Sequence, residues 1–134
     1  MSSIHISGFG INVADLDRSV EFYTHALGLQ EKMKFDAGEL HEVFVAGDGD
    51  RPAILLVKHA ERADAPEPGS GFEKIVLVTD DVDALHERVV ARGGTSFRAP
   101  WNMADLGIRV ALVRDPDGYL IELIEQQSGA ATSR

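Results

Sequence analysis

The sequence predicts an α+β fold built from two βαβββ modules, and two observations support this. A strand, a capped helix and a glycine stop occur twice, and a shift of 66 residues superposes Asp15 on Asp81 and Gly28 on Gly94. Each helix is also followed by short apolar strands joined by turn residues. We therefore assign one domain, residues 1–127, with modules at 1–58 and 73–125, a linker at 59–72 and a flexible tail at 128–134.

The first module begins with a strand and a helix in residues 9–29. Asp15 is a suitable N-cap, and an apolar stripe runs along one helix face until Gly28 ends the helix. The stripe comprises Leu16, Val20, Tyr23 and Leu27. Strands at 41–47 and 53–58 flank the turn GDGDRP and complete the module as an antiparallel hairpin.

The second module repeats this plan from a strand at 74–79. Asp80 or Asp81 caps its helix, Val82, Leu85 and Val89 form the apolar stripe, and two glycines end it. The strands GIRVALV and YLIELIE then flank DPDG, whose proline and glycine suit a tight turn. The stretch RAPWNMADLG, between helix and strand, is predicted to be a loop.

Composition limits the possible functions. The chain has 134 residues, 44% of them hydrophobic, which suits one globular domain with a real core. No apolar run approaches the roughly 20 residues of a membrane span, and the amino terminus lacks the pattern of a secretory leader, so we expect a cytoplasmic protein. Without cysteine, any metal would need His, Asp or Glu. The net charge of −9 argues against nucleic acid and favours a cationic small molecule.

The segments VADLDRSVEFYTHALGL and DPDGYLIELIE resemble those of the vicinal oxygen chelate superfamily, which includes glyoxalase I, bleomycin-resistance proteins and extradiol dioxygenases. The resemblance covers nearly the whole chain. It implies that the modules form a cupped mixed sheet of about eight strands, with the ligand cavity on the concave side and the helices on the convex side. It also implies homodimers whose cavities are completed across subunits.

The metal-dependent members of this superfamily carry four ligand positions on their strands. The resemblance places these positions at Gly8, Leu55, Lys74 and Glu122. Glycine and leucine offer no ligand atom, and a lysine ammonium has no lone pair. Only Glu122 matches, and a catalytic divalent site normally has about three protein ligands. We therefore expect no metal in this position and no other cofactor.

If the ligand positions converge as they do in the superfamily, Lys74 and Glu122 should form an ion pair within about 4 Å. One interpretation is structural, with the pair neutralising two polar residues. The other is catalytic: Lys74 holds a ligand oxygen while Glu122 moves a proton next to a carbonyl group. Both interpretations stay open from the sequence.

Strand alternation supplies further candidate ligand contacts. If Phe44 belongs to the core on the helix side, His41 faces the cavity, where it could join Glu122 in a displaced metal site. If Leu112 belongs to the core, Arg109 faces the cavity as well.

Leu55 and Trp101 complete the set of predicted ligand contacts. Leu55 occupies a ligand position of the superfamily, and Trp101, the sole tryptophan, is predicted to cover the cavity from its loop.

The predicted function is that of a small-molecule-binding protein with a degenerate metal site. It is either a simple binder or a metal-independent isomerase or lyase that uses Glu122 and Lys74. One alternative is a glyoxalase I-like lyase or a dioxygenase with a displaced metal site. A second alternative is a dimer that sequesters an antibiotic, as bleomycin-resistance proteins do.

Overall fold

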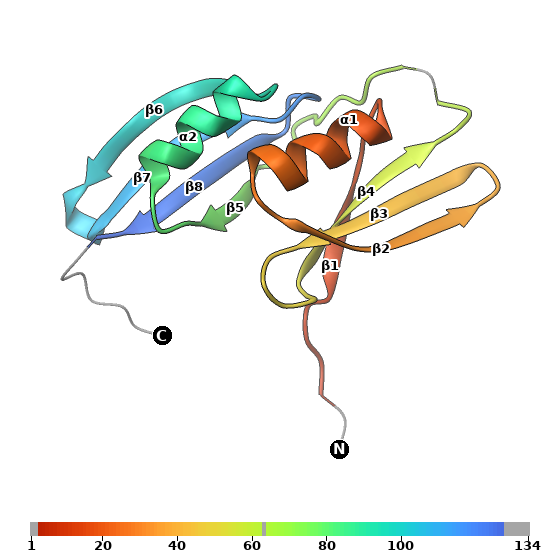
Figure 1. Cartoon of the computed structure of the whole chain (residues 1–134), viewed down its shortest axis with the longest axis horizontal. Coiled ribbons are helices and arrows are strands. Elements are labelled where there is room, and N and C mark those ends of the chain that lie inside the picture. The colour runs from red at the N-terminus through yellow and green to blue at the C-terminus, as the bar shows by residue number, and fades with distance from the viewer. Residues whose placement is uncertain (1–2, 63, 128–134) are drawn as a thin grey trace. The chain divides into compact units, whose positions relative to one another are not determined.

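The protein divides into two compact units, Met1–Pro66 and Glu67–Arg134 (Figure 1). Its structure, a computed structural model, describes residues 3–62 and 64–127. The boundary between the units falls inside the expected linker, whereas the expected tail lies outside the described residues. None of the described helices is long and apolar enough to cross a membrane.

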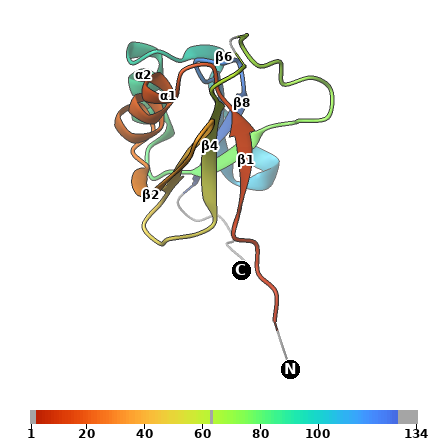
Figure 2. The same ribbon diagram turned by 90° about the vertical axis from the view of Figure 1, so that its right-hand side faces the viewer.

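Unit 1 is a four-stranded mixed sheet with a helix on one side, as Figure 2 shows. The strand order is β1-β4-β3-β2, with β1 parallel to β4 and the other pairs antiparallel. The elements are β1 (Gly8–Asn12), α1 (Leu16–Glu21), a π-helical continuation η1 (Phe22–Ala26), β2 (Gln30–Ala37), β3 (Leu40–Ala46) and β4 (Ala53–His59).

The helix of unit 1 begins where the sequence predicts. The Asp15 carboxylate accepts a hydrogen bond of 3.1 Å from the Arg18 backbone N–H, which satisfies one of the free donors of the first turn. Tyr23 and Leu27 are buried as the apolar stripe requires, at 0% and 6% exposure. Leu16 and Val20, the stripe residues within α1, are only half-buried, whereas η1 contributes three buried side chains, Phe22, Tyr23 and Ala26.

Unit 2 repeats the arrangement, with strand order β5-β8-β7-β6. Strand β5 is parallel to β8, and the remaining pairs are antiparallel. The elements are β5 (Ile75–Val78), α2 (Val82–Ala91), β6 (Thr95–Met103), the 3-10 turn η2 (Ala104–Leu106), β7 (Ile108–Arg114) and β8 (Leu120–Gln126). The predicted fold class, two βαβββ modules, is confirmed, with four hydrogen-bonded strands in each sheet.

Helix α2 covers one face of the sheet of unit 2. Its stripe residues Val82, Leu85 and Val89 are buried, and the Asp81 carboxylate accepts from the Ala84 backbone N–H at 3.1 Å. The sheet residues that build the core under this helix are fully buried: Ala111, Val113, Ile121 and Leu123. We call the opposite side of this sheet the helix-free face.

The DPDG segment forms the predicted tight turn and fixes the register of β7 against β8. Asp115 is buried, and its carboxylate accepts backbone hydrogen bonds from Asp117 at 2.8 Å and Tyr119 at 2.9 Å. Gly118 has a φ of 95°, a conformation that glycine adopts without strain. Arg114 is thereby paired with Leu120.

The loop predicted around Trp101 is wrong, because this residue lies inside strand β6. The strand pairs with β7 along its length, but the register shifts between Ser96 and Arg98 and again between Arg98 and Trp101. Such bulges break the alternation of apolar and polar residues by which a strand is recognised in a sequence.

Candidate functional site

Lys74 and Glu122 form an ion pair in unit 2. Strand β5 runs parallel to β8 with Val76 beside Glu122, and Lys74 directly precedes β5. The Lys74 Nζ lies 2.8 Å from Glu122 Oε1, and the two side chains are 33% and 17% exposed. The predicted ion pair is confirmed as a contact, while its catalytic role stays a prediction.

The pair fixes the protonation of the lysine. The hydrogen bond to Glu122 raises the pKa of Lys74 above its ordinary value of 10.5, against the opposing effect of burial. Lys74 therefore remains an ammonium at neutral pH and offers only N–H donors. Beside it, a carboxylate can accept a proton, and the ammonium can stabilise negative charge that develops on an oxygen.

Glu122 lies on the helix-free face, as strand alternation predicts. Its neighbours in β8, Ile121 and Leu123, are fully buried on the helix side. On β5, Val76 and Val78 are exposed at 50% and 71%. The ion pair therefore lies at a surface where apolar side chains are available to a ligand.

His41 lies on the opposite side of its sheet from the predicted one. Its alternating partners Val43 and Val45 are buried at 3% and 0%, whereas Phe44 is half-buried. His41 Nδ1 lies 2.7 Å from Asp36 Oδ1, and His41 lines a cavity of about 400 Å³ beside α1. The prediction assigned Phe44 to the core on the helix side because its side chain is large and apolar. An aromatic side chain can also lie on a ligand-facing surface, and His41 then lies on the helix side.

Leu55 and Gly8 are held by strand pairing in unit 1. Leu55 is half-buried and lies opposite Phe44, away from the helix, so its role as a ligand contact stays a prediction. Gly8 pairs with Ala53, and a Cβ atom at Gly8 would lie 2.2 Å from the Ala53 carbonyl oxygen. A side chain at position 8 would therefore require the backbone to move.

Arg109 also lies on the helix side, which corrects the prediction that it faces the ligand. It donates two hydrogen bonds of 2.9 Å to the carboxylate of Asp83, in the first turn of α2, and one of 3.1 Å to Asn102. The Arg109 guanidinium lowers the pKa of Asp83 below its ordinary value of 3.8. Arg109 therefore joins β7 to helix α2.

Trp101 lies on the helix-free face and supports an arginine. Its register partner in β7 is Val110, which pairs with Ile124, two residues beyond Glu122 on the same face. The Arg98 guanidinium lies 3.6 Å from the centre of the indole ring. Trp101 is therefore on the predicted side of the sheet, although in a strand.

Arg98 and Arg114 are candidate ligand-binding residues that the sequence reasoning missed. Arg98 pairs with Leu112, which pairs with Glu122, so these three residues share the helix-free face. Arg114 pairs with Leu120 on the same face. The length of the DPDG turn could have revealed this register, because it places Leu112 opposite Glu122.

Comparison with known proteins identifies the family. The profile of the Glyoxalase/Bleomycin resistance protein/Dioxygenase superfamily matches residues 4–123. The chain belongs to this superfamily.

Two curated relatives within the superfamily are probable lactoylglutathione lyases. The one from Synechocystis sp. is 35% identical over 121 residues, which cover 88% of this chain and 92% of the relative. The one from Vibrio cholerae is 31% identical over 134 residues, covering 98% and 97%.

Solved structures match as well. Glyoxalase I from Zea mays has a TM-score of 0.82 at 28% identity and covers 92% of this chain, which spans only 45% of the maize chain. An antibiotic binding protein from Streptomyces sp. CB03234 has a TM-score of 0.70 at 28% identity, covering 96% and 99%.

The residues at the positions that the resemblance predicts as metal ligands do not fit a divalent metal. Lys74 is protonated and bonded to Glu122, and Leu55 has no donor atom. Gly8 has no side chain and no room for one. One carboxylate alone does not supply the ligands that such an ion requires.

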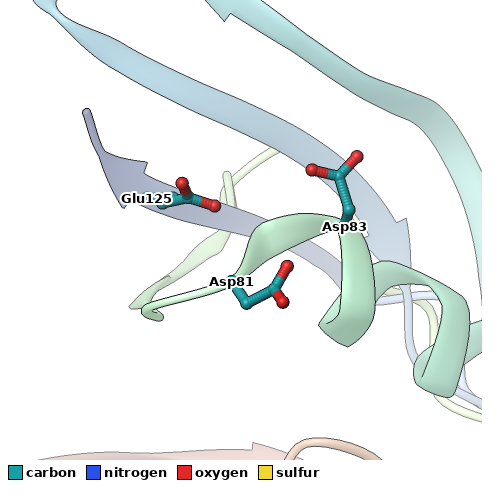
Figure 3. Close-up of side chains that lie close together, drawn as sticks. All are labelled: Asp81, Asp83 and Glu125. Carbon is teal, nitrogen blue, oxygen red and sulfur yellow. The ribbon is translucent and has the colours of Figure 1, made fainter. Parts of the chain in front are cut away.

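A different cluster of carboxylates, Asp81, Asp83 and Glu125, lies at the start of helix α2 (Figure 3). It is the one group of three possible metal ligands within the described part of the chain, and it includes neither His41 nor Glu122. Glu125 accepts from the Val82 backbone N–H at 2.8 Å, Asp81 caps Ala84, and Asp83 binds Arg109. Glu125 and Asp81 therefore cap the first turn of helix α2, and Asp83 joins the helix to β7.

Proposed function

We propose that the protein catalyses a proton shift next to a carbonyl group of a small molecule on the helix-free face of unit 2. Glu122 acts as the base that removes the proton, and the Lys74 ammonium stabilises the negative oxygen that results. The 2.8 Å contact between the two side chains carries this proposal, because it places a proton acceptor and a cation at one point.

The environment of the pair supports this assignment. Partial burial strengthens the interaction of an ammonium with a developing oxyanion, because less water screens the charge. The neighbouring Val76 and Val78 offer apolar contact to the carbon skeleton of a substrate. Proton transfer at carbon without a metal suits a substrate that is already activated, such as a ketone or a 2-oxoacid.

Sequence identity to relatives named lactoylglutathione lyase favours a second candidate function. In this case the protein would be a lactoylglutathione lyase that binds its metal at other residues than the predicted ligand positions. The relatives named for this activity are 35% and 31% identical over most of the chain. A third candidate, binding without turnover, is favoured by the 28% identity to the antibiotic binding protein over nearly its full length.

Deuterium exchange tests the proposal directly. Chelator-treated protein is incubated in D₂O with pyruvate, 2-oxobutyrate and 2-oxoglutarate, and exchange beside the carbonyl is followed by proton NMR. We expect the wild type to accelerate exchange in at least one compound and Glu122→Gln to reduce the rate to background. Glu73→Gln, which alters an exposed neighbouring carboxylate, should retain the activity.

Two other outcomes would refute the proposed proton shift. If wild type and Glu122→Gln give the background rate with all three compounds, the proposed proton shift fails. Lactoylglutathione lyase activity that appears only after nickel or zinc is added would establish the second candidate instead.

A further inference from the structure

The helix-free face of unit 2 carries an excess of positive charge. Three cations, Lys74, Arg98 and Arg114, lie on it with the carboxylate of Glu122, and the exposed Glu73 beside Lys74 adds a second acid at its edge. The chain as a whole has a net charge of −9. The local charge is therefore positive, whereas the net charge of the molecule is negative. The prediction of a cationic ligand used the net charge, and the charge of this face favours an anion instead.

Arg98 is held in a defined orientation without a counter-ion. Its guanidinium stacks on the Trp101 ring at 3.6 Å, and within the described ranges it has no ion pair or hydrogen bond. A stacked guanidinium keeps its N–H donors free at its edge, where a carboxylate binds through two parallel hydrogen bonds.

Arg114 provides a second cation on the same face. It lies 4.8 Å from the centre of the Phe97 ring and donates one hydrogen bond of 2.9 Å to the Gly118 carbonyl. No carboxylate among the described residues pairs with it. Arg98 on β6 pairs with Leu112 on β7, and Arg114 is two residues further along β7. Such diagonal neighbours have backbones about 7–8 Å apart. One ligand can therefore contact both arginines.

Arg109 provides a comparison within the same sheet. It lies on the same strand as Arg114 but on the helix side, where Asp83 neutralises it through two hydrogen bonds. Arg109 on the helix side thus has a carboxylate partner, whereas Arg98 and Arg114 on the helix-free face each lie against an aromatic ring.

We infer that the ligand of this face is an organic anion whose carboxylate binds Arg98, with Arg114 as the second contact. The inference rests on the proposed use of the helix-free face but does not require turnover. When the ligand's carboxylate binds these two arginines on β6 and β7, the remaining part of the ligand can extend across Leu112 towards Glu122 and Lys74. Across two strands this distance is about 10 Å, which a ligand with several carbon atoms spans.

Three planar probes of nearly equal shape test the sign of the charge: benzoate, neutral benzamide and cationic benzamidine. Phthalate adds a second carboxylate for Arg114. Trp101 is the only tryptophan, so its fluorescence reports binding beside Arg98. We expect benzoate to bind at least tenfold more tightly than benzamide or benzamidine, and phthalate to bind more tightly still. Benzoate affinity should fall as salt rises.

Substitutions test the residues. Arg98→Met should weaken benzoate binding by roughly tenfold or more, because it removes a charge-assisted bidentate contact. Arg62→Met removes an equal charge from an exposed position of unit 1, and Arg109→Met removes the arginine of the opposite face. Both should leave benzoate affinity within twofold of the wild type.

The inference is overturned if benzamidine binds as tightly as benzoate, if no anionic probe binds at millimolar concentration, or if Arg98→Met leaves affinity unchanged. Binding is measured with Glu122→Gln as well as with the wild type. Normal anion binding without deuterium exchange would refute the proposed function alone, and exchange without anion selectivity would refute this inference alone.

Discussion

Lys74 and Glu122 should depend on each other energetically. Removing one partner leaves a partly buried charge unpaired, which is the costly state, whereas removing both leaves none. In a double-mutant cycle with Lys74→Met and Glu122→Gln, we expect a coupling of about 0.5–2 kcal/mol in the free energy of unfolding. Urea denaturation of the four proteins measures it, and additive losses would show that the residues do not interact.

Asp83 should make unfolding depend on pH in the acid range. Arg109 lowers the pKa of Asp83 below 3.8, so the folded state favours the ionised carboxylate. The resulting stability is present above pH 3.8 and is lost as pH falls through the lower folded-state pKa. Asp83→Asn should therefore be less stable than the wild type at pH 6, with the difference disappearing in stronger acid.

Asp17→Asn is the matched control for this prediction. Asp17 occupies the equivalent first-turn position of α1, and no arginine is bonded to it among the described residues. Its substitution tests the helix dipole without the arginine contact. If both variants change with pH in the same way, the Arg109 contact does not cause the effect.

The β7–β8 hairpin should depend on the Asp115 carboxylate. Asp115→Ala leaves the backbone N–H groups of Asp117 and Tyr119 without their acceptor, at a cost of about 1–3 kcal/mol in the free energy of unfolding. Asp48→Ala in the β3–β4 turn changes an exposed carboxylate and should cost less than about 0.5 kcal/mol. Equal effects in urea denaturation would contradict this role of the turn.

The order of the elements was predictable because it depends on short-range signals. Helix caps such as Asp81 and turns such as DPDG act within a few residues, and the structure contains both. The Lys74–Glu122 contact was predictable because the superfamily resemblance placed both residues at converging positions, which the parallel pairing of β5 with β8 realises.

The orientation of the middle strands was not predictable from residue size. Phe44 and Leu112 are large and apolar, yet both lie away from the helices, and the faces of His41 and Arg109 were inverted as a result. A strand that is apolar on both sides does not reveal which side meets the helix. The bulges of β6 hid Trp101 and Arg98 for a related reason, because they interrupt alternation.

We expect the protein to form a homodimer, as the superfamily resemblance implies. Ten large hydrophobic side chains of the described residues are exposed, among them Ile4 at 97% and Val78 at 71%. A second copy that covers part of this surface should bury more than about 1,000 Å². Light scattering at micromolar concentration measures the mass, and a clean monomer would contradict the expectation.

The superfamily resemblance predicts that Lys74 and Glu122 occupy two positions that are metal ligands in the metal-dependent members, and their ion pair leaves no ligand set for a metal there. Calorimetric titration of nickel into the wild type and into Glu122→Gln measures whether a metal binds at this pair. Because Lys74 is protonated and Leu55 and Gly8 supply no donor, we expect no stoichiometric binding at micromolar affinity and no difference between the two proteins. Tight one-to-one binding by the wild type that Glu122→Gln abolishes would show instead that Glu122 is a metal ligand.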